Sequence, residues 1–280
     1  MIKKQIKYKG RVIFEKVVVS RFTRAPKYYM DDEACVMFLD GGEFTTRSSS
    51  QILKINNKSA LVSRCMNYYM EMSTSQEEIS ETVQAVGVML YPSVIQEIFD
   101  ITLLNPLINK TPSQKTYQVD PLLHAFKDSI SHLIDHPELA DEHIIVLKIR
   151  ELIFLLMKRE ASDSIVDYFS NLFNPVVHEI EQTVKTNLYS NLSIDELAFL
   201  AHMSTSTFKR RFKKIYNLSP HKYITAKKIE RACLLLSSTH YSISEISERC
   251  GFESISTFNR NFNNAMNRSP SVFRTELKSN

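Results

Sequence analysis

The chain of 280 residues has 43% apolar side chains, which suits about two domains of the usual ~100 to 200 residues each. Its five glycines form none of the glycine-rich motifs of dinucleotide-binding enzymes, P-loop proteins or nucleophile-elbow hydrolases, and we expect no enzymatic activity. The net charge is +4, and the basic excess lies in residues 171–280, which hold 15 Lys and Arg against 9 Asp and Glu. If these cations cluster on one helix, they would suit a polyanionic partner.

Up to about residue 120 the chain carries short apolar runs that are rich in β-branched and aromatic side chains. These runs are residues 12–19, 35–39, 52–55, 60–66 and 86–91. They predict a small β-barrel or sandwich. All eight histidines lie at or after His124, so a histidine-based metal site in this region is excluded by the lack of ligands. We expect neither a metal nor any other cofactor.

A helical period starts at Leu122 and predicts one helix to about Ile134 and a second over about residues 142–159. The second helix is apolar on nearly all sides but too short to cross a bilayer, so it must be buried on more than one side. It packs either in the core of its own domain or, as we favour, against a second copy of the chain. The residues expected in such a homodimer interface are Ile145, Leu152 and Leu156.

These patterns divide the chain into two expected domains. Residues 1–165 form the first domain, with a β-barrel over about 1–120 and helices over about 121–160. Residues 166–175, which end at Pro175, are the expected linker, and residues 176–280 form an all-α second domain.

The second domain contains an internal repeat with a period of about fifty residues. Residues 206–223 and 256–273 are identical at eight of eighteen positions. Upstream of the two copies, Ser193 and Ser242 begin the similar segments S-I-x-E-L and S-I-x-E-I, and each serine is the expected N-cap of a short helix. Each copy is therefore predicted to be a helix-turn-helix.

A further helix is predicted between the two copies, from Pro220 to about Leu236. Its roughly 17 residues would span ~25 Å, a suitable scale for holding two recognition helices one DNA turn, ~34 Å, apart. One chain could then read two adjacent segments of the major groove.

The second helix of each copy is predicted to present a polar face to solvent. In the first copy, 100° per residue places Phe212 and Ile215 beside Phe208 on the buried side. The residues on the opposite side are Ser206, Lys209, Arg210 and Lys213. The corresponding residues of the second copy are Ser256, Asn259, Arg260 and Asn263. Arg pairs with guanine and Asn with adenine in the major groove, so both faces are typical of DNA recognition; two ordinary solvated faces are the alternative.

The second copy also matches a longer pattern, I-x-x-I-A-x-x-x-G-F-x-x-x-x-x-F-x-R-x-F-x-x-x-x-x-x-x-P-x-x-x-R. The matching residues are Ile243, Ile246, Gly251, Phe252, Phe258, Arg260, Phe262, Pro270 and Arg274, with Ser247 in place of the usual Ala. With this pattern, residues 176–277 resemble the DNA-binding domain of the AraC/XylS transcription regulators. The resemblance implies that double-stranded DNA is bound by Ser206, Lys209, Arg210, Ser256, Thr257, Asn259 and Arg260. Cys250 is expected to pack under the turn.

The resemblance also implies a role for the first domain. In this family the amino-terminal part often looks like a cupin-type barrel that senses an effector and is followed by dimerisation helices. We therefore expect an α+β protein: a cupin-like barrel with following helices, then an all-α domain with two helix-turn-helix units joined by a linker helix. The expected function is that of a bacterial transcription regulator, with activation through RNA polymerase as the favoured mode. The effector, a small molecule or a protein, stays open.

Two other functions are weighed against this one. An alkyl-transferring DNA-repair protein would need clustered zinc-binding cysteines, whereas Cys35 and Cys65 have no C-x-x-C partners. A non-specific architectural DNA binder would not need two differentiated recognition faces. The cysteine spacing fits reduced thiols, and no stretch reaches the ~18 apolar residues of a membrane span, so we expect a soluble cytoplasmic protein without membrane contact.

Overall fold

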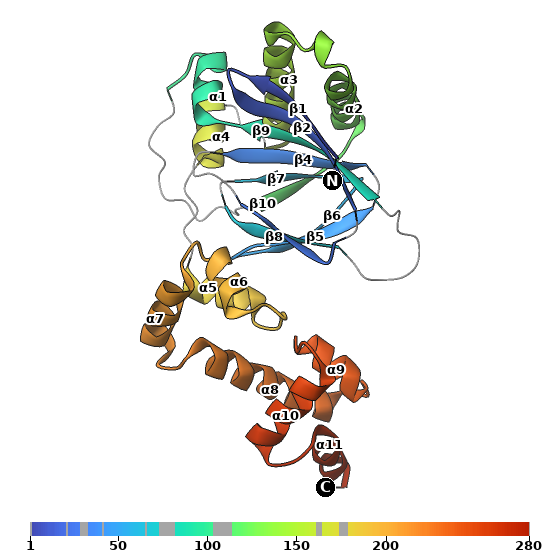
Figure 1. Cartoon of the computed structure of the whole chain (residues 1–280), viewed down its shortest axis with the longest axis vertical. Coiled ribbons are helices and arrows are strands. Elements are labelled where there is room, and N and C mark those ends of the chain that lie inside the picture. The colour runs from blue at the N-terminus through green and yellow to red at the C-terminus, as the bar shows by residue number, and fades with distance from the viewer. Residues whose placement is uncertain are drawn as a thin grey trace. The chain divides into compact units, whose positions relative to one another are not determined.

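The structure is a computed structural model that describes two compact parts of the chain (Figure 1). We call Met1–Val177 the N-terminal unit and His178–Asn280 the C-terminal unit, and consider each by itself. The described residues are 2–20, 22–28, 33–40, 42–64, 66–72, 82–102, 114–160, 164–173 and 179–279. No helix within these ranges is long and apolar enough to span a bilayer.

The N-terminal unit contains two antiparallel sheets. In spatial order, the six-stranded sheet is formed by β1 (Ile2–Tyr8), β2 (Arg11–Ser20), β9 (Thr82–Leu90), β4 (Ala34–Asp40), β7 (Ser59–Ser63) and β10 (Gln114–Gln118). The four-stranded sheet is formed by β3 (Arg24–Lys27), β8 (Tyr68–Met72), β5 (Glu43–Arg47) and β6 (Ile52–Asn56). The predicted β-rich region is confirmed, but its described strands form two open sheets and do not close into one hydrogen-bonded barrel.

A cavity of about 220 Å³ is lined by side chains from both sheets. Its wall is mainly apolar and rich in methionine: Met37 and Met89 come from the six-stranded sheet, and Met70 and Met72 from the four-stranded sheet. The charged residues that line it are Lys3, Glu15 and Lys27. Lys3 and Glu15 form an ion pair at 2.7 Å.

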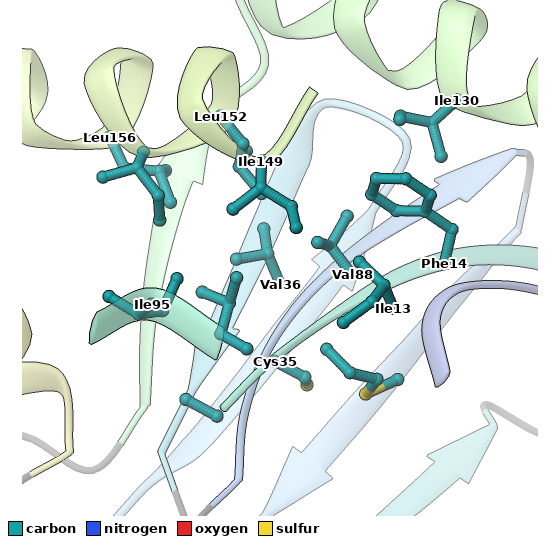
Figure 2. Close-up of a cluster of buried hydrophobic side chains, with 14 of the residues drawn as sticks. Ile13, Phe14, Cys35, Val36, Val88, Ile95, Ile130, Ile149, Leu152 and Leu156 are labelled. Atoms are coloured by element: carbon teal, nitrogen blue, oxygen red, sulfur yellow. The ribbon is translucent and has the colours of Figure 1, made fainter. Parts of the chain in front are cut away.

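Helices cover the six-stranded sheet of the N-terminal unit. They are α1 (Pro92–Phe99), α2 (Pro121–Asp135), α3 (Glu142–Glu160) and α4 (Ile165–Leu172). The short 3-10 helix η1 (Pro137–Leu139) follows α2 and buries none of its residues. The predicted helices over 122–134 and 142–159 correspond to α2 and α3. The helix α2 contacts β1, β2 and β9 as well as α3. Ile149 of α3 and Ile130 of α2 belong to the same buried cluster as Phe14 and Val88 of the sheet (Figure 2).

The residues predicted for a dimer interface lie in this cluster. Ile145, Leu152 and Leu156 are all buried within their own chain. Figure 2 shows Leu152 and Leu156 among the buried side chains of this cluster. Because these side chains are already covered by the sheet and helices of one protomer, they have no surface left for a second copy. Their assignment to the interface was wrong, and the alternative, packing in the domain's own core, is correct. The large apolar side chains that α3 exposes are different ones, Leu147 at 64% and Phe154 at 55%.

The segment 166–175, predicted as a linker, also differs from the expectation. Most of it forms α4, which begins at the N-cap Ser164 and buries Tyr168, Phe169 and Leu172 in the core of the N-terminal unit. A linker was predicted because the segment follows a long helix and ends at Pro175. Its aromatic residues instead extend the apolar core, and residues 174 and 175 lie outside the described ranges.

The C-terminal unit is entirely helical. Its helices are α5 (Ile180–Asn187), α6 (Ile194–Leu200), α7 (Thr205–Tyr216), α8 (Pro220–Ser238), α9 (Ile243–Arg249), α10 (Ile255–Met266) and α11 (Pro270–Ser279). The first helix-turn-helix is α6 with α7, the second is α9 with α10, and α8 joins them (Figure 1). This arrangement confirms the predicted all-α domain.

Candidate nucleic-acid interface

The two helix-turn-helix units begin in the same way. Ser193 Oγ accepts a hydrogen bond from the backbone N–H of Glu196 at 3.2 Å, while the Glu196 carboxylate accepts one from the backbone N–H of Ser193 at 2.7 Å. Ser242 and Glu245 repeat both bonds at 3.2 and 2.7 Å. Each serine is thus the predicted N-cap, and each pair forms a complete capping box that satisfies backbone donors at the helix start.

The second helices, α7 and α10, are also built alike. Ser204 and Ser254 cap their first turns, and Asn217 and Asn267 end them with positive φ angles of 55° and 54°. The residues that anchor them are the fully buried phenylalanines at the predicted positions, Phe208 and Phe212 in α7 and Phe258 and Phe262 in α10. The shared ends and anchors fix which face of each helix is left for solvent.

The predicted recognition residues lie on this outer face, with one exception. The exposed residues are Ser206, Lys209, Arg210 and Lys213 on α7 and Ser256, Asn259 and Arg260 on α10. Thr257 is only half-buried, and its side chain accepts a hydrogen bond from Ser254 Oγ at 3.0 Å. It lines a groove of about 520 Å³ between the two helix-turn-helix units.

One residue of the predicted buried face is misplaced. Ile215 is 42% exposed, although its angular position on α7 is close to that of Phe208. The neighbouring Tyr216 takes the packing position instead, because its ring lies 4.5 Å from that of Phe212 and 4.3 Å from that of Tyr223 on α8. The last turn of α7 therefore packs against α8 through Tyr216 and leaves Ile215 in solvent.

The two outer faces differ in charge. The helix α7 has five exposed cations, Lys209, Arg210, Arg211, Lys213 and Lys214. The helix α10 has one cation, Arg260, among several asparagines. Two structurally equivalent helices thus offer one face suited to phosphates and guanine and another suited to hydrogen bonding with adenine.

Family models match both units of the chain. A helix-turn-helix domain matches residues 185–276, and the ExsA N-terminal regulatory domain matches residues 34–168. The xylose operon regulatory protein of Escherichia coli (strain K12) is 29% identical over 161 residues, which are 58% of this chain and 37% of that protein. The Msm operon regulatory protein of Streptococcus mutans is 32% identical over 104 residues, which are 37% of each chain. This chain thus covers little more than a third of the length of these relatives.

The chain belongs to the AraC/XylS family. Among solved structures, the DNA-binding domain of AdpA in complex with a target DNA is 27% identical and covers 37% of this chain and 93% of that chain, with a TM-score of 0.35. ToxT from Vibrio cholerae O395 is 15% identical and covers 94% of this chain and 98% of that chain, with a TM-score of 0.36.

Within this AraC/XylS domain, sequence reasoning missed one buried cation. Lys228 lies on α8, and its Nζ donates hydrogen bonds to the backbone carbonyls of Ser190 at 2.7 Å and Gly251 at 2.6 Å. Burial lowers the pKa of Lys228 to about 8. A signal was present in the sequence, because Lys228 is four residues after Ile224 and four before Ala232, on the apolar stripe of the predicted helix.

The cysteine of the second turn lies where it was expected. Cys250 is fully buried in the core of the second helix-turn-helix, together with Ile246, Phe258 and Phe262. Burial raises the pKa of its thiol to about 11. Cys233 and Cys250 are free thiols, whereas Cys65 lies outside the described residues.

Proposed function

We propose that the protein is a sequence-specific regulator of transcription that places α7 and α10 in two segments of the major groove of double-stranded DNA. The observation that carries this proposal is the pair of equivalent helices with different polar faces, one cationic and one rich in asparagine. A protein that only coats DNA would gain nothing from this difference. The family of the chain supports the same function.

The side chains of the two helices have different roles in this proposal. On α7, Lys209 and Lys213 contact phosphates, and Arg210 pairs with a guanine. On α10, Asn259 and Arg260 read bases, while Ser256 contacts the backbone. Thr257 supports Ser254 at the start of α10 through the hydrogen bond between their hydroxyls.

The test is a selection of bound sequences from random DNA, using the full-length chain. We expect one enriched site with two conserved segments about one helical turn apart, and an affinity that falls steeply with salt because phosphates are neutralised. Competition with random DNA then measures the specificity. A protein that binds every sequence equally would be an architectural binder, and one that binds no DNA would contradict the proposal.

Regulation by the N-terminal unit is the second part of the proposal. The Met-rich cavity between the two sheets favours a small apolar molecule as effector, because flexible methionines adapt to the shape of such ligands. Its volume of about 220 Å³ exceeds the roughly 150 Å³ in which an apolar cavity binds a molecule the size of benzene.

Benzene is therefore a suitable first probe of the cavity. We expect it to raise the thermal stability of the wild-type chain and to have no such effect on Ala85→Phe, which fills the cavity from its lining. An equal response of both proteins would place the binding elsewhere. No response in either would favour a protein as the effector.

We further propose that the protein is a cytoplasmic homodimer that activates transcription through RNA polymerase and has no enzymatic activity. Leu147 and Phe154, the exposed large apolar residues of α3, are seven residues apart and therefore lie on one face of the helix. We propose this face as the dimer contact. An alkyl-transfer function would need clustered metal-binding cysteines, and no group of three or more metal-binding side chains occurs in the part of the chain that the structure describes.

A further inference from the structure

Two kinds of contact hold the two helix-turn-helix units together. The first is α8, which contacts α7 of the first helix-turn-helix and α9 and α10 of the second. The second is a direct approach between the backbone at Tyr189 and Ser190, which precedes α6, and the turn at Gly251, which precedes α10. Lys228 of α8 joins the two sides of this approach. We call Tyr189, Ser190, Lys228 and Gly251 the inter-unit clamp.

The clamp requires glycine at position 251. Its φ of +73° lies in the left-handed region, and a Cβ at this position would be 2.2 Å from the carbonyl oxygen of Tyr189 and 2.7 Å from that of Ser190. These neighbours are backbone atoms, so they cannot move aside as a flexible side chain would. The turn of the second helix-turn-helix is therefore in close backbone contact with the segment that precedes the first.

The clamp also requires the ammonium group of Lys228. Its hydrogen bonds reach the carbonyl of Ser190, in the segment just before the first helix-turn-helix, and the carbonyl of Gly251, in the turn of the second. The residue is 9% exposed, and hydrogen bonds from a charged group are stronger than those between neutral groups. The Arg231 guanidinium lies 4.1 Å from the ring centroid of Tyr189 and holds the same segment against α8 from another side.

We propose that the inter-unit clamp, through Lys228 and Gly251, fixes the separation of α7 and α10 and so determines which spacing between two major-groove segments the protein accepts. The inference rests on the proposed DNA-binding function. One inserted base pair moves a segment by ~3.4 Å and turns it by about a tenth of the helix. A rigid pair of recognition helices cannot follow this change, whereas a pair joined by α8 alone can bend toward it.

The first experiment measures spacing preference with the full-length chain. The selected DNA site is compared with variants that have one base pair inserted or removed between the two segments. The protein variants are Lys228→Met, which removes the donors, Lys228→Arg, which keeps a buried cation, and Lys227→Met as the matched control. Lys227 is the neighbouring cation on α8, and it pairs with Glu230 at 2.7 Å outside the clamp.

We expect Lys228→Met to reduce the preference for the native spacing by about tenfold, the equivalent of about 1.4 kcal/mol. Lys228→Arg should restore most of the preference, and Lys227→Met should keep it. A general loss of stability would weaken all sites equally and leave their ratio unchanged, so an unchanged ratio in Lys228→Met would overturn the proposal. Should this variant not fold, Lys228→Gln is tested by the same criterion.

A second experiment examines the clamp without DNA. Spin labels attached through non-natural amino acids at positions 214 and 264 report the distance between α7 and α10 in the free full-length protein. We expect a narrow distribution in the wild type and in Lys227→Met, and a broader one in Lys228→Met. Equal widths in all three proteins would contradict the clamp even if DNA binding itself were confirmed. Conversely, this distance can support the clamp even if the proposed DNA-binding function fails.

Discussion

His202 and Gly251 occupy the same position in the two helix-turn-helix turns, and both have positive φ angles, 52° and 73°. Their surroundings differ. The turn at Gly251 lies against the backbone of Tyr189 and Ser190, just before the first helix-turn-helix, so a side chain is excluded there. The first turn carries an exposed histidine at the same position.

This difference predicts unequal effects of alanine at the two positions. Gly251→Ala should lower the free energy of unfolding by more than ~2 kcal/mol, because it adds a backbone clash to an unfavourable φ. His202→Ala already has space for its Cβ and should cost less than ~1 kcal/mol. Urea unfolding followed by circular dichroism measures both. A loss from Gly251→Ala as small as that from His202→Ala would show that the close approach does not exclude a side chain.

The two recognition helices should respond differently to loss of a side chain. Lys213→Ala should weaken binding to all DNA sequences and reduce the negative slope of log affinity against log salt by about 0.9, because one phosphate contact is lost. Arg210→Ala and Asn259→Ala should each cost ~1 to 3 kcal/mol at a single base position, guanine for the first and adenine for the second. Binding titrations against single-base variants of the selected site test this. Uniform weakening by Asn259→Ala would assign that side chain to the phosphate backbone.

An aspartate introduced on the buried face of α3 and one introduced on its exposed face should have different consequences. Leu152→Asp places an unpaired carboxylate in the core of the N-terminal unit, and we expect the unit to lose its cooperative unfolding transition. Leu147→Asp is on the exposed face and should leave the transition intact while lowering the mass of the oligomer in light scattering. If Leu147→Asp and the wild type have the same mass, α3 is not the dimer contact.

The N-terminal unit should lose stability in acid through Asp135. Hydrogen bonds from Lys16 at 2.5 Å and Lys4 at 2.6 Å lower the pKa of this carboxyl to about 2, below the ordinary value of about 3.8. The unfolded chain therefore binds the proton first as the pH falls, and the stabilisation is present above about pH 4 and lost toward pH 2. Because solvent screens the group, we expect Asp135→Asn to cost about 1 kcal/mol at pH 6. Urea titrations should show this difference shrinking by pH 3.

The C-terminal unit could be predicted in detail because its determinants are local. The first helix of each helix-turn-helix starts with a serine and a glutamate three residues apart, and the buried face of each second helix carries two phenylalanines four residues apart. Ile215 departs from the pattern because the helical period continues beyond the point where the small core ends. The hydrogen bonds of Lys228 reach residues 38 and 23 positions away in the chain. They depend on the tertiary arrangement, which cannot be read from a helical period.

The N-terminal unit could be predicted only in outline. Alternating apolar residues indicate strands but not which strands pair, so two open sheets and a closed barrel have the same pattern. The apolar faces of α3 likewise showed that Leu152 is buried without showing what covers it. Packing against the domain's own sheet and packing against a second copy of the chain would both require the same apolar side chains.

The buried thiol of Cys250 provides a chemical reporter of this domain. A thiolate is the reactive form of cysteine, and the raised pKa and full burial keep this one unreactive while the turn is closed. Alkylation at Cys250 therefore requires the second helix-turn-helix to open. The rate of alkylation, followed by mass spectrometry of the intact wild-type protein, therefore measures how often the second helix-turn-helix opens locally. DNA that stabilises the closed turn should lower this rate.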